Sequence, residues 1–226
     1  MTDTIPSLDD LKTGDVILFS DTTNWASRII EYFTGSKWSH VGIVLRDPIY
    51  IDPKLTGLYL WESGPEDMND AEDNVQKWGV QIVDLRAKIK EYNGTISGRK
   101  ITNINKLPLD TKERDAKIQV IFNTTYDKPY DYNPLDMIFC LLKLQYMNSR
   151  SLNSVFCSAF ASYIYTELGY LDKSTNWSMI EPCHFSSEYT PMIDKSDNDN
   201  DWQVVSESGG LKFVNGFTLE AEIKIK

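Results

Sequence analysis

The stretch that decides the fold is Leu152-Asn-Ser-Val-Phe-Cys-Ser-Ala-Phe-Ala-Ser-Tyr-Ile-Tyr-Thr-Glu-Leu-Gly-Tyr-Leu171. Large apolar residues recur in it at steps of three and four, which is typical of the buried face of a helix. These residues are Phe156, Phe160, Tyr163, Ile164 and Leu168. Asn153 or Ser154 can cap the start of this helix, and Gly169 can end it. We therefore expect a buried helix with Cys157 in its first turn.

Outside this helix, segments of strand length and β-rich composition dominate the first third of the chain. They are Asp15-Val-Ile-Leu-Phe-Ser20, Val41-Gly-Ile-Val-Leu45 and Leu58-Tyr-Leu-Trp-Glu62. Alternation predicts a further strand over 79–85 and a closing hairpin within 202–226. The remaining helical patterns cover 24–33, 110–126 and 135–146. No repeat, linker or second domain interrupts these patterns, so we expect one domain over 1–226.

The composition is that of a folded protein and gives no indication of nucleic-acid binding. Of the 226 residues, 41% are hydrophobic and 25% are charged, and the net charge of −10 opposes phosphate backbones. The most apolar window, 135–144, contains Asp136 and Lys143 and is too short to span a bilayer. The three cysteines lack a Cys-x-x-Cys spacing, and the start of the chain lacks the apolar run of a secretory signal. These features favour a reducing, cytoplasmic location.

Histidine is scarce, so imidazole chemistry near pH 7 has to use His40 or His184. His40 opens the strand 41–45, and alternation places Glu62 on an otherwise apolar strand face, where an acid needs a partner. Cys157 lies where the free amides and dipole of a helix N-terminus favour a thiolate and can hold an oxyanion. The three residue types together suit nucleophilic catalysis, with Cys157 attacking, His40 transferring the proton and Glu62 orienting His40.

Each of these residues also has a purely structural interpretation. Cysteine is among the most buried residue types, so Cys157 fits a core position, as does Cys140. A lone histidine at a strand start can be structural, and Glu62 can be a surface acid on an edge strand. Cys183 and His184 are adjacent, but two ligands without further ones make no zinc site, so we predict no bound metal.

Several blocks of the chain resemble the YiiX-like branch of the permuted NlpC-type papain-like proteins, a superfamily of cysteine hydrolases and acyltransferases. The blocks are Leu11-Lys-Thr-Gly-Asp-Val-Ile-Leu-Phe19, Trp25-Ala-Ser-Arg-Ile-Ile-Glu-Tyr-Phe-Thr-Gly-Ser-Lys-Trp-Ser-His-Val-Gly-Ile-Val44, Trp61-Glu-Ser63, Lys128-Pro-Tyr-Asp-Tyr132, Phe156-Cys-Ser-Ala-Phe160 and Met179-Ile-Glu-Pro-Cys-His-Phe185. Papain-like enzymes usually place the nucleophilic cysteine before the histidine. Here His40 precedes Cys157, as in the circularly permuted members, which include lecithin:retinol acyltransferase-like proteins.

The resemblance implies an α+β, circularly permuted papain-like fold in which an antiparallel sheet packs on the helix carrying the cysteine. Its core would cover about 11–185, followed by C-terminal strands over about 202–226. By position in the motifs, Cys157 matches the nucleophile, His40 the base and Glu62 the third, polar member. Tyr130 and Asp131 match a segment that lines or braces the pocket.

These features predict a cysteine-dependent hydrolase or acyltransferase that acts on an amide, ester or thioester and needs no cofactor. Aromatic residues such as Trp38, together with the lipid-handling relatives, favour a small-molecule, lipid or peptide substrate and are compatible with peripheral membrane contact. An intracellular or viral relative fits the absence of an export signal. The alternative is a non-catalytic module that holds a lipid or peptide in the same groove. The sequence leaves the substrate and the oligomeric state open.

Overall fold

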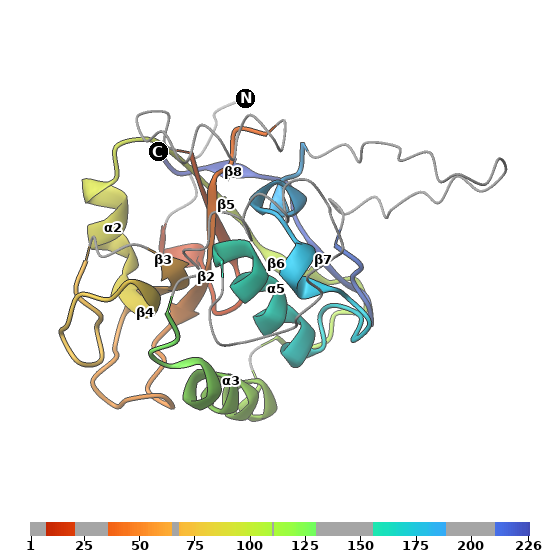
Figure 1. Cartoon of the computed structure of the whole chain (residues 1–226). Helices are drawn as coiled ribbons and strands as arrows, with labels where there is room; N and C mark the ends of the chain where they lie inside the picture. Colours follow the sequence, from red (N-terminus) through yellow and green to blue (C-terminus); the bar gives the residue numbers. More distant parts are fainter. Residues whose placement is uncertain (1–7, 21–35, 65–67, 110, 130–155, 189–210) are drawn as a thin grey trace, which may run out of the picture.

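An antiparallel sheet forms the centre of the structure (Figure 1). The computed structural model describes residues 8–20, 36–64, 68–109, 111–129, 156–188 and 211–226. The strands are β1 (Val16–Ser20), β2 (His40–Arg46), β3 (Leu58–Gly64), β4 (Gly79–Asp84), β5 (Thr95–Arg99), β6 (Ile101–Asn103), β7 (Phe217–Leu219) and β8 (Ile223–Lys224). The main sheet has the order β4-β3-β2-β1-β5-β8, all neighbours antiparallel, and β6 pairs with β7 in a second sheet. The α-helices are α2 (Leu85–Glu91), α3 (Lys112–Thr125) and α5 (Cys157–Leu168), and the 3-10 helices are η1 (Leu8–Asp10), η3 (Trp177–Met179) and η4 (Pro182–Phe185).

The two faces of the main sheet carry separate hydrophobic clusters, because successive side chains of a strand point to opposite faces. In β1, Val16 and Leu18 belong to the cluster that includes the buried residues of α5. Ile17 and Phe19 belong to the cluster that includes Leu85 of α2. The helices α5 and α2 therefore cover opposite faces of the sheet, and the strands between them are buried on both sides.

The sequence predictions for the central elements are confirmed. Strands occur at all four predicted positions in the first 85 residues, and α3 falls within the predicted helix 110–126. The α+β class and the antiparallel sheet packed on the cysteine-bearing helix are confirmed, since α5 packs on β2 and β3. The predicted helices 24–33 and 135–146 lie outside the described residues, and the single-domain organisation stays a prediction.

Two features of the predicted cysteine helix have different outcomes. Gly169 ends α5 in the left-handed conformation with φ 79°, as predicted. The prediction that Asn153 or Ser154 caps the start is wrong, because the N-cap is Phe156, with extended backbone and no side-chain capping bond. Cys157 is therefore the first residue of the helix itself.

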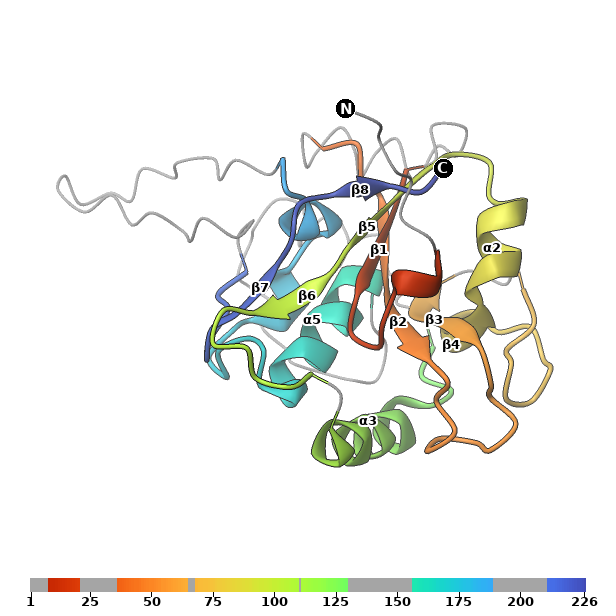
Figure 2. The same ribbon diagram turned by 180° about the vertical axis from the view of Figure 1, so that it is seen from behind.

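The end of the chain also differs from the prediction. We expected a hairpin within 202–226, but β7 pairs with β6 and β8 pairs with β5 (Figure 2). The segment 86–91, for which no element was predicted, forms most of α2. Alternation identifies a strand but carries no information about its partner, and here the unpaired edges of β5 and β6 take up the C-terminal strands.

Replacing Gly169 by alanine should lower the free energy of unfolding by about 1–2 kcal/mol, because an L-residue with a Cβ is strained in the left-handed conformation. A Cβ at this position would meet no atom within 4 Å, so backbone strain alone is tested. The measurement is the urea midpoint. Gly169→Asn should lose less, because asparagine tolerates this conformation. Equal midpoints for the wild type and Gly169→Ala would contradict the left-handed helix end.

Candidate active site

His40 is the first residue of β2, opposite Phe19 of β1. Its side chain is 18% exposed, and its ring lies 5.5 Å from the ring of Phe19. Nε2 of His40 lies 2.6 Å from Oε2 of Glu62 on the neighbouring strand β3. One ring nitrogen of His40 is thus paired with a carboxylate, which leaves Nδ1 for a second partner.

Glu62 is completely buried, with a 0% exposed side chain. Alternation correctly places it on the face of β3 that carries Leu60, because both point toward the side of α2. Its Oε1 accepts a hydrogen bond from Nε2 of Gln81 at 3.2 Å and forms an ion pair with Nζ of Lys88. Burial by itself raises the pKa of this carboxyl, but the charges and hydrogen bonds of Lys88 and His40 lower it to about 2. Glu62 is therefore ionised at neutral pH.

Cys157 lies at the N-terminus of α5 and is 4% exposed. Its side chain is within hydrogen-bonding range of the imidazole of His40. Burial would lower the pKa of His40, but the negative charges of Cys157 and Glu62, with hydrogen bonds to both, raise it to about 10. Since Nε2 is paired with Glu62, Nδ1 is the nitrogen that is left for the sulfur.

The backbone around Cys157 offers donors for a negatively charged oxygen. Within α5, the first N–H that donates to a helix carbonyl is that of Phe160, to the carbonyl of Phe156 at 2.9 Å. The N–H groups of the residues before Phe160 in this turn have no carbonyl in the helix to bind. A thiol, an imidazole, a carboxylate and amides without a helix carbonyl to bind therefore meet where β2, β3 and α5 converge.

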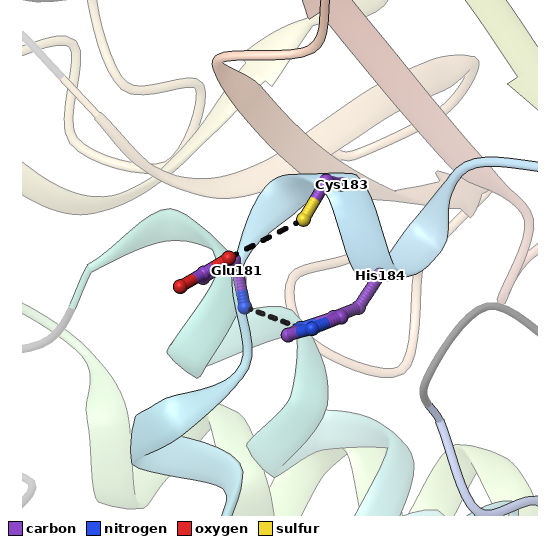
Figure 3. A group of neighbouring side chains, drawn as sticks. All are labelled: Glu181, Cys183 and His184. Atoms are coloured by element: carbon purple, nitrogen blue, oxygen red, sulfur yellow. Dashed lines mark hydrogen bonds between the residues drawn. The ribbon is translucent and has the colours of Figure 1, made fainter. Parts of the chain in front are cut away.

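A second set of cysteine, histidine and glutamate lies on η4 and just before it (Figure 3). The donor atoms of Glu181, Cys183 and His184 lie within 4.8 Å of one another, and all three residues are buried. The Cys183 thiol donates to Oε2 of Glu181 at 3.4 Å, and the backbone N–H of Glu181 donates to Nδ1 of His184 at 2.9 Å. If these residues held a metal ion, His184 would bind it through Nε2, because Nδ1 of His184 already accepts the N–H of Glu181.

This second set is less suited to nucleophilic chemistry than the first. The sulfur of Cys183 hydrogen-bonds to a carboxylate, which repels the negative charge of a thiolate. Cys183 is also completely buried, at 0% exposed. In the first set, by contrast, the imidazole of His40 interacts with both the sulfur of Cys157 and the carboxylate of Glu62.

The remaining predicted site residues have mixed outcomes. Trp38 is completely buried, and its Nε1 donates to Oε1 of Glu222 at 3.2 Å, so its contact with a substrate stays a prediction. Tyr130 and Asp131 lie outside the described residues. The further partners of Glu62, Gln81 and Lys88, were not predicted from the sequence. A signal for Lys88 exists, because Leu85, Lys88 and Ile89 have the spacing of one helix face, which places a lysine among apolar residues.

A cleft of about 590 Å³ lies away from this chemistry, at the far end of β2. Its lining includes Arg46, the last residue of β2, and Arg114 of α3. The guanidinium of Arg46 donates to the carbonyls of Leu8, Asp9 and Leu11. The guanidinium of Arg114 donates to the carbonyl of Leu109 and to the carboxylate of Asp115. Because both guanidinium groups have structural partners, we assign the cleft no role in the reaction.

Comparisons with known proteins give likenesses to solved structures and no match to a protein-family model or a curated protein. Among solved structures, the chain is similar to the metalloprotein YiiX from Escherichia coli O157:H7, DUF1105, with 22% sequence identity and a TM-score of 0.43. The likeness covers 70% of this chain and 66% of YiiX, just under two thirds of its length. The predicted resemblance to YiiX is confirmed. At this TM-score it carries no argument about packing or activity.

A membrane-spanning helix is absent from the described ranges, since none of their helices is both long and apolar enough to cross a bilayer.

Proposed function

We propose that this protein is a cysteine-dependent hydrolase or acyltransferase that acts on an amide, ester or thioester. The observation that carries the proposal is the bonding of His40, whose imidazole pairs with the buried Glu62 carboxylate and reaches the sulfur of Cys157 at a helix N-terminus. The parts of nucleophilic catalysis are a nucleophile, a base and a group that orients the base, and these three residues supply them.

The reaction would proceed in two acyl transfers. The proton of Cys157 passes to Nδ1 of His40, whose pKa of about 10 lets the ring hold that proton at pH 7. The sulfur then attacks the carbonyl carbon, and the N–H of Cys157 helps to hold the oxyanion. The bond to the leaving group then breaks, and Nδ1 gives its proton to that group, which leaves a thioester on Cys157. Water, or an alcohol or amine acceptor, attacks the thioester while His40 takes its proton. The bond to sulfur then breaks and the sulfur recovers a proton from His40.

The order of the chain fits a circularly permuted papain-like arrangement, because the strand with the base precedes the helix with the nucleophile. Such an arrangement places the substrate between β2 and the start of α5. A lipid or peptide acyl group stays our prediction for the substrate class.

Selective alkylation of Cys157 tests the proposal. Iodoacetamide near pH 7, followed by peptide mass spectrometry, should label Cys157 at least about 10-fold faster than Cys183, because an ordinary thiol is only a few per cent ionised at this pH. In urea-unfolded protein the thiols should react at similar rates, which is the control for peptide recovery. Equal or absent labelling of Cys157 in the folded protein would instead favour the non-catalytic binding module.

A further inference from the structure

Lys88 is buried, at 3% exposed, where lysine is rare in proteins. It lies on α2, whose first turn is fixed by the Asp84 side chain accepting a bond from the N–H of Ala87 at 2.7 Å. Nζ of Lys88 forms an ion pair with Oε1 of Glu62. Removing an ammonium group from water carries a large cost in free energy, which a hydrophobic residue at this position would avoid. The ion pair explains how the lysine is tolerated and leaves open what it contributes.

The carboxylate of Glu62 is held at both of its oxygens. Oε2 lies 2.6 Å from Nε2 of His40, whereas Oε1 is bound by Nζ of Lys88 and, at 3.2 Å, by Nε2 of Gln81. Contacts at Oε1 from α2 and β4 fix the plane of the carboxylate. They therefore determine the direction in which Oε2 meets the imidazole.

A line of interactions runs from the Cys157 side chain through the imidazole of His40 and the carboxylate of Glu62 to the ammonium group of Lys88. The line crosses the sheet, because α5 and α2 lie on opposite faces. The uncharged amide of Gln81 on β4 also contacts Glu62, and the ring of Phe19 on β1 lies beside His40 and under Nζ of Lys88. Lys88 thus lies on the other side of the sheet from the sulfur, and it acts through Glu62.

The proposed reaction, on which this inference rests, requires His40 to gain and lose a proton in each cycle. When the imidazole is neutral, the buried carboxylate of Glu62 no longer has that cation beside it. Burial raises the pKa of Glu62, and the charge of Lys88 is the largest of the influences that lower it, ahead of that of His40. An ionised Glu62 accepts the Nε2–H of His40, so the unprotonated nitrogen of the neutral ring is Nδ1, the nitrogen left to take the proton of the sulfur.

We infer that Lys88 is a positioning residue, which keeps the Glu62 carboxylate ionised and oriented toward His40 while the imidazole gains and loses its proton.

The test is the pH profile of Cys157 alkylation by iodoacetamide between pH 2 and 10. Lys88→Met keeps the length of the side chain and removes its charge. An opposite charge at close range shifts a carboxyl pKa by about 1–3 units. In this variant the pKa of Glu62 should rise. We therefore expect the acid limb, the part of the profile where the alkylation rate increases with pH, to move to higher pH by about one unit or more. Lys88→Arg should restore the wild-type profile, and Lys90→Met, at an exposed position of the same helix, should leave it unchanged.

The outcomes separate the inference from the proposed function. A purely structural role of Lys88 predicts a lower rate at every pH with no movement of the acid limb, and that result would overturn the inference. If Lys88→Met does not fold, the double variant Lys88→Met/Glu62→Gln removes both charges. It should fold and alkylate slowly, and a wild-type rate and profile in it would equally refute the role of Lys88. Absence of preferential Cys157 labelling in the wild type would instead refute the proposed function.

Discussion

Replacing His40 by alanine is expected to lower the rate at which p-nitrophenyl acetate acylates Cys157 by about 10²–10⁴-fold at pH 7, the usual contribution of a positioned general base. The imidazole is the group within hydrogen-bonding range of the sulfur and is itself bonded to Glu62. Because p-nitrophenolate leaves without the help of an acid, the loss reports removal of the thiol proton. The measurement is the first-turnover release of p-nitrophenolate, with mass spectrometry to place the acetyl group on Cys157.

The matched control for this variant is His184→Gln, which removes the other histidine of the chain. A glutamine oxygen can still accept the N–H of Glu181 that Nδ1 of His184 accepts in the native protein. This variant should acylate Cys157 at close to the wild-type rate. Added imidazole should restore part of the rate to His40→Ala, because a free base can enter the space of the lost ring. An acylation rate that survives the loss of His40 would remove that residue from the site.

Local pattern was sufficient to predict the elements that carry the three site residues. The alternation of β3 assigns Glu62 to the face of Leu60, and this is where the structure has it. The three- and four-residue spacing after Cys157 predicts α5, and Gly169 marks its end. The period of a strand or helix is a property of a few consecutive residues, so one sequence contains it.

Contacts between distant segments could not be predicted in the same way. The alternation of the C-terminal residues indicated strands, but the choice of β5 and β6 as partners depends on which edges the rest of the sheet leaves unpaired. The pairing of Lys88 with Glu62 likewise requires α2 to pack on the face that carries Glu62. A helical pattern shows which side of α2 is buried, but not which acid it meets.

The N-cap was predicted wrongly, because the capping propensity of a residue stabilises a helix only if the helix begins directly after that residue. Asn153 and Ser154 are good N-cap residues, but the chain enters the helix at Phe156, whose backbone is extended. A start at Cys157 gives up a side-chain cap. It leaves the first amides of α5 beside the sulfur, where an oxyanion would need them.

Replacing Glu62 by leucine is expected to destabilise the protein by about 3–5 kcal/mol, the cost of removing one partner of a buried ion pair. The variant leaves the buried ammonium of Lys88 without its carboxylate and removes the acceptor of Nε2 of His40. The measurement is the free energy of unfolding in urea at pH 7. The double variant Glu62→Leu/Lys88→Met should recover most of the loss, because an apolar pair of similar volume replaces the buried charges. If the losses of unfolding free energy in Glu62→Leu and in Lys88→Met added up to the loss in the double variant, the two side chains would not interact.

The pH dependence of unfolding provides a second test of the same pair. The pKa of Glu62 is lowered from 4.5 to about 2, so between these values the unfolded chain binds a proton that the folded chain does not. The stability that Glu62 contributes is therefore present above pH 4.5 and is lost as the pH falls toward 2. Asp15, whose pKa burial raises to about 6, opposes this trend at higher pH, but it is common to wild type and variant and cancels in their difference. The stability difference between wild type and Glu62→Leu/Lys88→Met should thus shift in favour of the double variant as the pH falls from 4.5 to 2, and a constant difference would mean that Glu62 is not held as a buried anion.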